Sequence, residues 1–155
     1  MSSQVESSSP GRVLVVDDDD DLLEILGILL QSHGFEVSLA DGGPKALEIA
    51  RDADLDVIIL DVMMPRMDGF EVCRELKKVP SAASVPVILL TARDDLEARA
   101  QGMYGEVSEF LPKPFNEEQL VSRIRTQVAS RRHEQALRAL QERAEALQSP
   151  SGRPA

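Results

Sequence analysis

Three short runs of adjacent apolar residues constrain the fold of this 155-residue chain more than any other feature. They are VLVV at 13–16, DVIIL at 56–60 and VPVILL at 85–90. Each run has the length of a β-strand, and its apolar residues follow one another instead of alternating with polar ones. Such strands are typical of a parallel sheet that helices cover on both faces. The sequence therefore predicts a parallel sheet inside an α/β domain.

Helical patterns separate these strands. Two weaker strand signals, EVSLA at 36–40 and EFL at 109–111, bring the predicted strands to five. Five helices are also indicated. Apolar residues recur at helical spacing from Leu22 to Leu29 in the first, Pro44 opens the second, and Asp68-Gly69 starts the third. The fourth is expected over 94–103, and Asn116 with Gln119 forms a capping-box arrangement at the start of the fifth. Strands that alternate with helices predict a doubly wound α/β domain.

The ends of the chain differ from its middle. Residues 1–11 are rich in Ser and 149–155 read SPSGRPA, so both segments are expected to be disordered. The α/β domain is expected over 12–130, and a helical extension over 131–148, which contains no Pro or Gly. Arg131 and Arg132 are expected on its solvated face. The extension carries Leu137, Leu140, Ala144 and Leu147 at the spacing of a coiled-coil seam, which suggests a homodimer, although two heptads are short for one.

Charge and cysteine content exclude several functions. The chain has a formal net charge of −10, and residues 1–115 hold 22 acidic against 10 basic side chains. Such a surface repels phosphate backbones, so direct nucleic-acid binding is not expected. One cysteine permits no internal disulfide and suits a reducing compartment. No apolar run approaches the roughly 18 residues of a membrane span, and no secretory signal opens the chain, so we expect a cytoplasmic protein.

The candidate chemistry lies at the strand ends. In an open parallel sheet, ligands bind beyond the carboxyl ends of the strands. Asp17 and Asp18 follow the first strand, Asp61 the third, Thr91 the fourth, and Lys113 comes just after the fifth. Three carboxylates in one pocket repel one another unless a cation offsets them. Mg²⁺ and a phosphoryl group would suit such a pocket, with Asp61 as the candidate acceptor of an aspartyl phosphate.

Four segments resemble the signature segments of bacterial response-regulator receiver domains, which belong to two-component systems. They are VLVVDDD, DVIILDVMMPRMDGFEV, PVILLTAR and EFLPKPF, in the right order over about 115 residues. The resemblance implies a flavodoxin-like five-stranded sheet of order 2-1-3-4-5, as in chemotaxis regulators. It also implies a phosphorylation-activated switch whose partner is a histidine kinase or a phosphotransfer protein.

The resemblance assigns roles to the acidic residues. Asp61 matches the phosphoacceptor. Asp17 and Asp18 match the acidic pair that binds Mg²⁺ together with Asp61, and the backbone carbonyl of Met63 completes the protein ligands. In the family, the residue at the position of Met63 also tunes the lifetime of the phosphoryl group.

The remaining roles concern the response to phosphorylation. Thr91 matches the hydroxyl that moves toward the phosphoryl group, and Phe110 matches the switch aromatic. Lys113 matches the lysine that pairs with phosphoryl oxygens, and the Lys113–Pro114 bond is typically cis in the family. The switching face would comprise the fourth helix, fifth strand and fifth helix, a second candidate surface for a homodimer. Glu106-Val107 departs from the Gly-Ala that is common there.

Two other functions remain open. The first is an adaptor that keeps the receiver fold without being phosphorylated, which the departure at Glu106-Val107 would suit. The second is a haloacid-dehalogenase-like phosphatase. Such enzymes carry a second Asp two residues after the nucleophile, where this chain has Met63. We do not expect an enzyme beyond self-phosphorylation and slow loss of the phosphoryl group. The downstream partner stays open.

Overall fold

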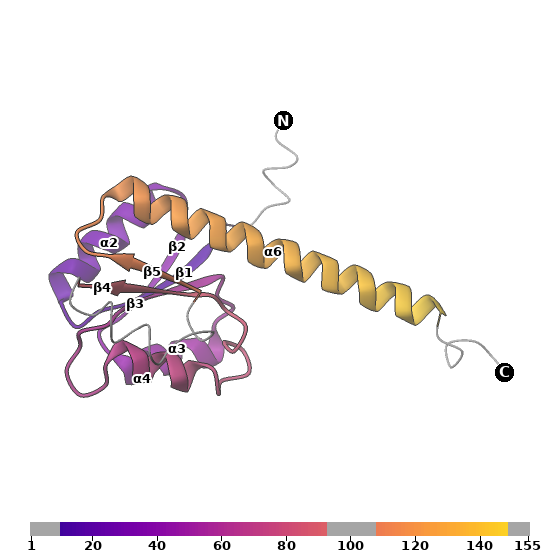
Figure 1. Ribbon diagram of the computed structural model, residues 1–155, viewed down its shortest axis with the longest axis horizontal. Helices are drawn as coiled ribbons and strands as arrows, with labels where there is room; N and C mark the ends of the chain where they lie inside the picture. Colours follow the sequence, from indigo (N-terminus) through magenta and orange to yellow (C-terminus); the bar gives the residue numbers. More distant parts are fainter. Residues whose placement is uncertain (1–9, 93–107, 149–155) are drawn as a thin grey trace.

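A computed structural model describes residues 10–92 and 108–148 of the chain (Figure 1). Their centre is a five-stranded, all-parallel sheet of order β2-β1-β3-β4-β5, which confirms the predicted fold class and strand order. The strands are β1 (Arg12–Val16), β2 (Glu36–Ala40), β3 (Val57–Asp61), β4 (Val87–Thr91) and β5 (Glu109–Pro112).

The described helices form two layers on the sheet. They are α2 (Asp20–Ser32), α3 (Gly43–Asp52), α4 (Gly69–Leu76) and α6 (Glu117–Gln148). Figure 1 shows α2 and α6 on one face of the sheet and α3 and α4 on the other. The predicted helix at 94–103 lies outside the described residues, as do 1–9 and 149–155. No helix in the described part of the chain is long and apolar enough to cross a membrane.

The helices begin where the sequence signals them. Asp19 caps α2, and its carboxylate accepts hydrogen bonds from the N–H groups of Asp21 and Leu22. Asp68 forms a capping box with Glu71 at the start of α4. Asn116 and Gln119 exchange the same pair of bonds before α6. These bonds satisfy backbone N–H groups that have no partner within the helix.

The core has two halves because side chains alternate across each strand. Val13 and Val15 of β1 face α2 and α6, whereas Leu14 and Val16 face α3 and α4. Strands β3 and β4 are buried along their whole length, as their adjacent apolar residues predict. The edge strands β2 and β5 are only partly buried. The sheet is therefore covered by helices on both faces.

One sequence-based expectation about α6 is wrong. Arg131 and Arg132 are half-buried and contact the domain instead of lying on a solvated face. Arg132 Nη2 donates to Asp56 Oδ2 (3.0 Å) and to the carbonyl of Pro10 (2.9 Å). Arg131 Nη1 donates to the carbonyl of Ser84 (3.1 Å). Asp56 is itself buried at the start of β3, so it favours a cationic partner over solvent.

Candidate functional site

The predicted site residues meet at the carboxyl edge of four neighbouring strands. Asp17 follows β1, Asp61 ends β3, Thr91 ends β4 and Lys113 follows β5. The register aligns these ends, because Asp61 lies opposite Leu90 and Thr91 lies opposite Pro112. The backbone N–H of Lys113 also donates to the Thr91 carbonyl (2.7 Å). Residues far apart in sequence are therefore placed side by side by the sheet alone.

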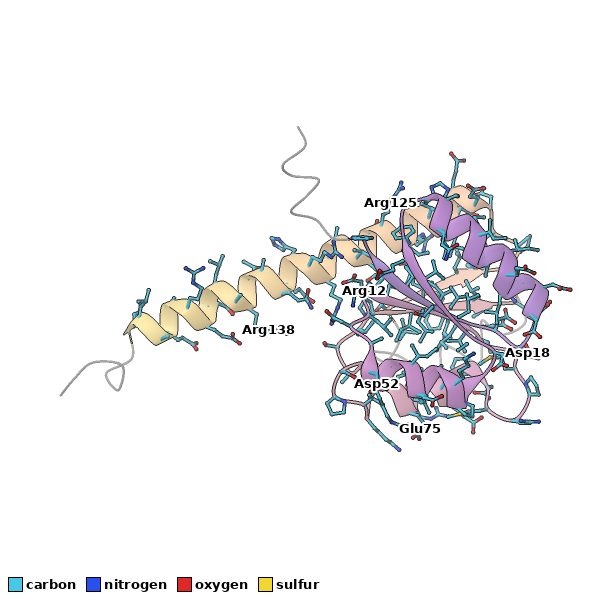
Figure 2. The ribbon with its side chains drawn as sticks, turned by 180° about the vertical axis from the view of Figure 1, so that it is seen from behind. Arg12, Asp18, Asp52, Glu75, Arg125 and Arg138 are labelled. Carbon is cyan, nitrogen blue, oxygen red and sulfur yellow. The ribbon has the colours of Figure 1, made fainter. Side chains whose placement is uncertain are left out.

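Three carboxylates form the centre of this edge. Asp17, Asp18 and Asp61 each offer one oxygen, and these oxygens lie within 4.8 Å of one another. Asp17 and Asp61 are buried, whereas Asp18 is exposed at the end of the domain remote from Arg12 (Figure 2). The cluster is therefore covered by protein at Asp17 and Asp61 and open to solvent at Asp18.

One cation enters the cluster from β5. Lys113 Nζ donates to Asp61 Oδ1 at 2.8 Å, and the Asp61 side chain is only 7% exposed. A single ammonium group offsets one of three negative charges. The remaining charge is unfavourable in a half-buried site unless protons or a bound cation offset it.

The surroundings of Asp17 shift its pKa. Burial raises the pKa of Asp17 from its ordinary value of 3.8 to about 6. The N–H of Asp19, which donates to Asp17 Oδ1 at 2.9 Å, lowers this pKa, and the carboxylate of Asp61 raises it. The other oxygen, Oδ2, is buried and has no hydrogen-bond partner among residues 10–92 and 108–148.

The donor set fits a divalent metal ion. A hard cation such as Mg²⁺ prefers oxygen ligands, takes one or two carboxylates and keeps several waters. Asp17 Oδ2 is an unpartnered buried oxygen of the required kind, and exposed Asp18 leaves room for water on the outer side. The three aspartates therefore suit Mg²⁺ by their chemistry and spacing.

Thr91 and Phe110 lie on the neighbouring strands β4 and β5. Thr91 is fully buried, and its hydroxyl has no hydrogen-bond partner in the described part of the chain. Phe110 lies on β5 beside Leu89 of β4 and packs, half-buried, against the core beneath α3 and α4. A buried hydroxyl without a partner is costly, so Thr91 is poised for an acceptor or donor that arrives at the site.

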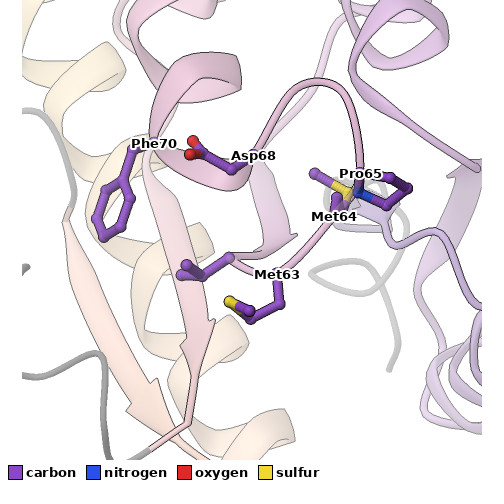
Figure 3. Close-up of a pocket in the computed structure, with 6 residues that line it drawn as sticks. Met63, Met64, Pro65, Asp68 and Phe70 are labelled. Atoms are coloured by element: carbon purple, nitrogen blue, oxygen red, sulfur yellow. The ribbon is translucent and has the colours of Figure 1, made fainter.

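The loop between β3 and α4 closes one side of the site. Arg66 in this loop has a φ of +70°, a strained conformation for a residue other than glycine. Met63 is 66% exposed and lines a pocket with Val62, Met64, Pro65, Asp68 and Phe70 (Figure 3). The Lys113–Pro114 peptide bond is cis, as the family resemblance implies.

Sequence reasoning missed the part that Gly69 plays. A Cβ atom at Gly69 would lie 2.6 Å from the backbone oxygen of Asp61 and 2.9 Å from Val62 Cα. The Gly69 N–H also donates to the Val62 carbonyl (3.0 Å). A glycine in the first turn of a helix, where better helix formers are available, could have signalled this close approach. The Glu106-Val107 departure lies outside the described residues.

The fold and the acidic edge define a class of protein that known sequences also identify. Residues 13–125 match the response regulator receiver domain family. The chain belongs to this family, and it is a response regulator receiver domain of a two-component system.

A curated protein and a solved structure show how far the similarity extends. Response regulator MprA of Mycobacterium sp. (strain KMS) is 43% identical over 116 residues, which are 75% of this chain and 50% of that protein. The chain thus spans about half the length of the MprA proteins that it matches. The crystal structure of adenylate cyclase from Rhodopirellula baltica has a TM-score of 0.79 and 30% identity, covering 86% of this chain and 98% of that one.

A further structure is similar in overall fold. The receiver domain of sensor histidine kinase PA1611 from Pseudomonas aeruginosa PAO1 was crystallised with a magnesium ion coordinated in its active site cleft. It has a TM-score of 0.70 and 26% identity to this chain, and the match covers 77% of this chain and 98% of that one.

Proposed function

We propose that this chain is a phosphorylation-dependent signalling switch in which Asp61 accepts a phosphoryl group. The donor is the phosphohistidine of a histidine kinase or a phosphotransfer protein. The observation that carries the proposal is the pairing of Asp61 Oδ1 with Lys113 Nζ at 2.8 Å, inside a cluster of three carboxylates. A carboxylate held this way combines a competent acceptor with a cation for the incoming phosphoryl oxygens.

The transfer needs little covalent work from the protein. A carboxylate oxygen of Asp61 forms a bond to phosphorus as the bond from phosphorus to the histidine nitrogen breaks. The leaving imidazole keeps the electron pair and takes up a proton. Asp17, Asp18, Asp61 and the carbonyl of Met63 would hold Mg²⁺. When bound, this ion would supply charge neutralisation at the phosphoryl oxygens.

The response to phosphorylation would start at Lys113 and Thr91. Lys113 Nζ can move from the Asp61 carboxylate to an oxygen of the phosphoryl group, with which it can form a charge-assisted hydrogen bond. The buried Thr91 hydroxyl can donate to another phosphoryl oxygen, which would satisfy a group that lacks a partner among the described residues. Phe110 would then fill the space that Thr91 leaves. Contacts of the surface around β5 and α6 with a downstream protein would change accordingly.

The surface of α2 suits the phosphohistidine donor. Ile25 and Ile28 are 58% and 63% exposed, although α2 also packs Leu23 and Leu26 into the core. The two isoleucines are three residues apart and share a side of the helix, which begins directly after the acidic pair. An apolar surface beside the site would hold a donor protein while its histidine reaches Asp61.

Labelling with acetyl phosphate and Mg²⁺ tests the proposal. The full chain is expected to gain one phosphoryl group by mass spectrometry, and Asp61→Asn is expected to gain none. Asp52→Asn is the matched control, because Asp52 is exposed and lies far from Asp18 (Figure 2). An unlabelled wild type would favour the adaptor function. Turnover of a generic phosphomonoester would favour the phosphatase.

A further inference from the structure

The last 16 residues of α6, from His133 to Gln148, form an arm whose side chains are all exposed. Figure 1 shows this arm projecting beyond the domain, and Figure 2 shows Arg138 on it, away from the sheet. Three of the arm's side chains are large and apolar. Leu137, Leu140 and Leu147 are 46%, 58% and 84% exposed. Leucines exposed at regular spacing along one helix mark a surface for another helix.

The apolar stripe of the arm faces away from the domain. Each residue of an α-helix turns by about 100°, so 18 residues complete five turns. By this count the residues that α6 buries against the sheet lie on one side, and the apolar stripe lies on the opposite side. The buried set is Leu120, Val121, Ile124 and Val128, and the stripe is Leu137, Leu140, Ala144 and Leu147. A helix that packs on the stripe therefore avoids the domain.

The direction of the arm is fixed at its base. Arg132 bonds Asp56 at the start of β3 and the carbonyl of Pro10, and Arg131 bonds Ser84. Since Asp56 also accepts the Arg12 N–H (2.9 Å), these contacts join α6 to the amino-terminal ends of β1 and β3. The helix then continues without a break from the domain into the arm. A fixed arm loses less conformational entropy when it associates than a loose one.

We propose that the arm binds the arm of a second copy of this chain, as a parallel two-stranded coiled coil. Leu137 and Ala144 would occupy a positions, and Leu140 and Leu147 d positions. Because the stripe faces away from the domain in each copy, the two domains would lie on opposite sides of the seam. This pairing is independent of phosphorylation and goes beyond the switch proposed above.

The charges beside the seam favour a second copy in parallel orientation. In a parallel pair, Ala136 would lie beside Gln141 of the second copy, and Arg143 beside Gln148 of the second copy. No like charges meet in this arrangement. In an antiparallel pair that aligns the same leucines, Arg143 would lie near Arg143 of the second copy. Like charges beside a helical seam oppose pairing, so the parallel arrangement is preferred.

Sedimentation of the full chain over a range of concentrations tests the pairing. The wild type is expected to show a reversible monomer–dimer equilibrium, since two heptads bind weakly. Leu140→Asp is expected to raise the Kd by at least about tenfold, because it places a charge in the seam. Ala139→Asp adds the same charge on the other side of the helix and is expected to leave the Kd within about threefold. Circular dichroism checks that both variants stay folded.

Cysteine crosslinking tests the orientation. Leu147→Cys is expected to form a disulfide-linked dimer on mild oxidation, because the same d position meets itself in a parallel pair. Ala146→Cys lies away from the seam and is expected to crosslink poorly. Cys73 is buried and contributes none of this product. A wild type that stays monomeric at all concentrations, or equal crosslinking at 146 and 147, would overturn the proposal. Neither result bears on labelling of Asp61, so the two proposals can fail separately.

Discussion

Lys113 Nζ reaches across the end of β4 to within 2.8 Å of Asp61 Oδ1, joining residues that are 52 positions apart in the chain. The intervening strand ends in Thr91, which lies opposite Pro112 in the sheet. The lysine and the acceptor are thus positioned by three adjacent strands.

Replacing Lys113 by Gln is expected to slow labelling of Asp61 from acetyl phosphate by about 10- to 100-fold, because the phosphoryl oxygens lose a cation. The rate is measured by mass spectrometry at saturating Mg²⁺. Lys78→Gln is the control, since Lys78 pairs with Glu75 on an exposed surface. Equal rates for the Lys113 variant and the wild type would rule out this role.

The raised pKa of Asp17 predicts a pH-dependent cost in the metal-free protein. Its pKa is about 6 in the folded chain against 3.8 ordinarily, so the folded state holds the extra proton between these values. The contribution of Asp17 to the free energy of unfolding should therefore fall as pH rises from about 4 to 6. Asp17→Asn should be more stable than wild type at pH 7.5 by about 1–3 kcal/mol, and no more stable near pH 4.

Urea unfolding in a chelator at both pH values checks this expectation, with Asp52→Asn as the control. With Mg²⁺ present, the wild type should instead be more stable than the Asp17 variant. The wild type should gain stability as the ion binds, and the Asp17 variant should gain less. An Asp17 variant that is less stable than wild type at pH 7.5 without metal would refute the assignment.

Gly69→Ala is expected to distort the acceptor. The added methyl would lie 2.6 Å from the backbone oxygen of Asp61, and a backbone atom in the sheet has little room to move. We expect a loss of about 1–3 kcal/mol in the free energy of unfolding, together with slower labelling. Gly42→Ala is the control, since its Cβ would meet only Pro44 Cδ, at 3.9 Å. Thermal unfolding and labelling together test the prediction, which fails if the two variants behave alike.

Met63 is expected to lengthen the life of the phosphorylated state. Its apolar side chain lies two residues after Asp61 and is 66% exposed, so it can hinder the approach of water from the solvent side. Met63→Asn should shorten the half-life of the label, and Met63→Leu should preserve it. A pulse-chase in Mg²⁺ measures both. Loss of the wild-type label within seconds would contradict the shielding role.

Ile28→Asp is expected to separate protein donors from small ones. A charge in the exposed apolar pair on α2 should slow transfer from a phosphorylated phosphotransfer protein by about tenfold or more. Labelling by phosphoramidate, which needs no docking surface, should not change. Ala83→Asp adds the same charge at an exposed position before β4, at the opposite end of the sheet from Asp61, and serves as the control. Parallel losses with both donors would place the effect of Ile28→Asp on folding instead of docking.

Within residues 10–92 and 108–148, the sequence alone was sufficient for the elements and for the residues that end the strands. Adjacent apolar residues in 57–60 and 87–90 predict strands buried on both faces, because a strand side chain has only two directions to point. The helix starts at Asp68 and Asn116 depend on side chains within three residues, so local chemistry predicts them. The polar residues at the strand ends could also be singled out from the sequence, because ligands of an open α/β sheet bind beyond the carboxyl ends of its strands.

Only the tertiary structure decided the distances and the unexpected contacts. The distance between Asp61 and Lys113 depends on strand order and register, which interactions between residues close in sequence do not determine. The close approach of Gly69 to Asp61 and the bond from Arg132 to Asp56 join segments whose meeting depends on how every layer packs. Local patterns report what a residue prefers within a few neighbours. Which distant residue satisfies a buried charge is fixed by the whole fold.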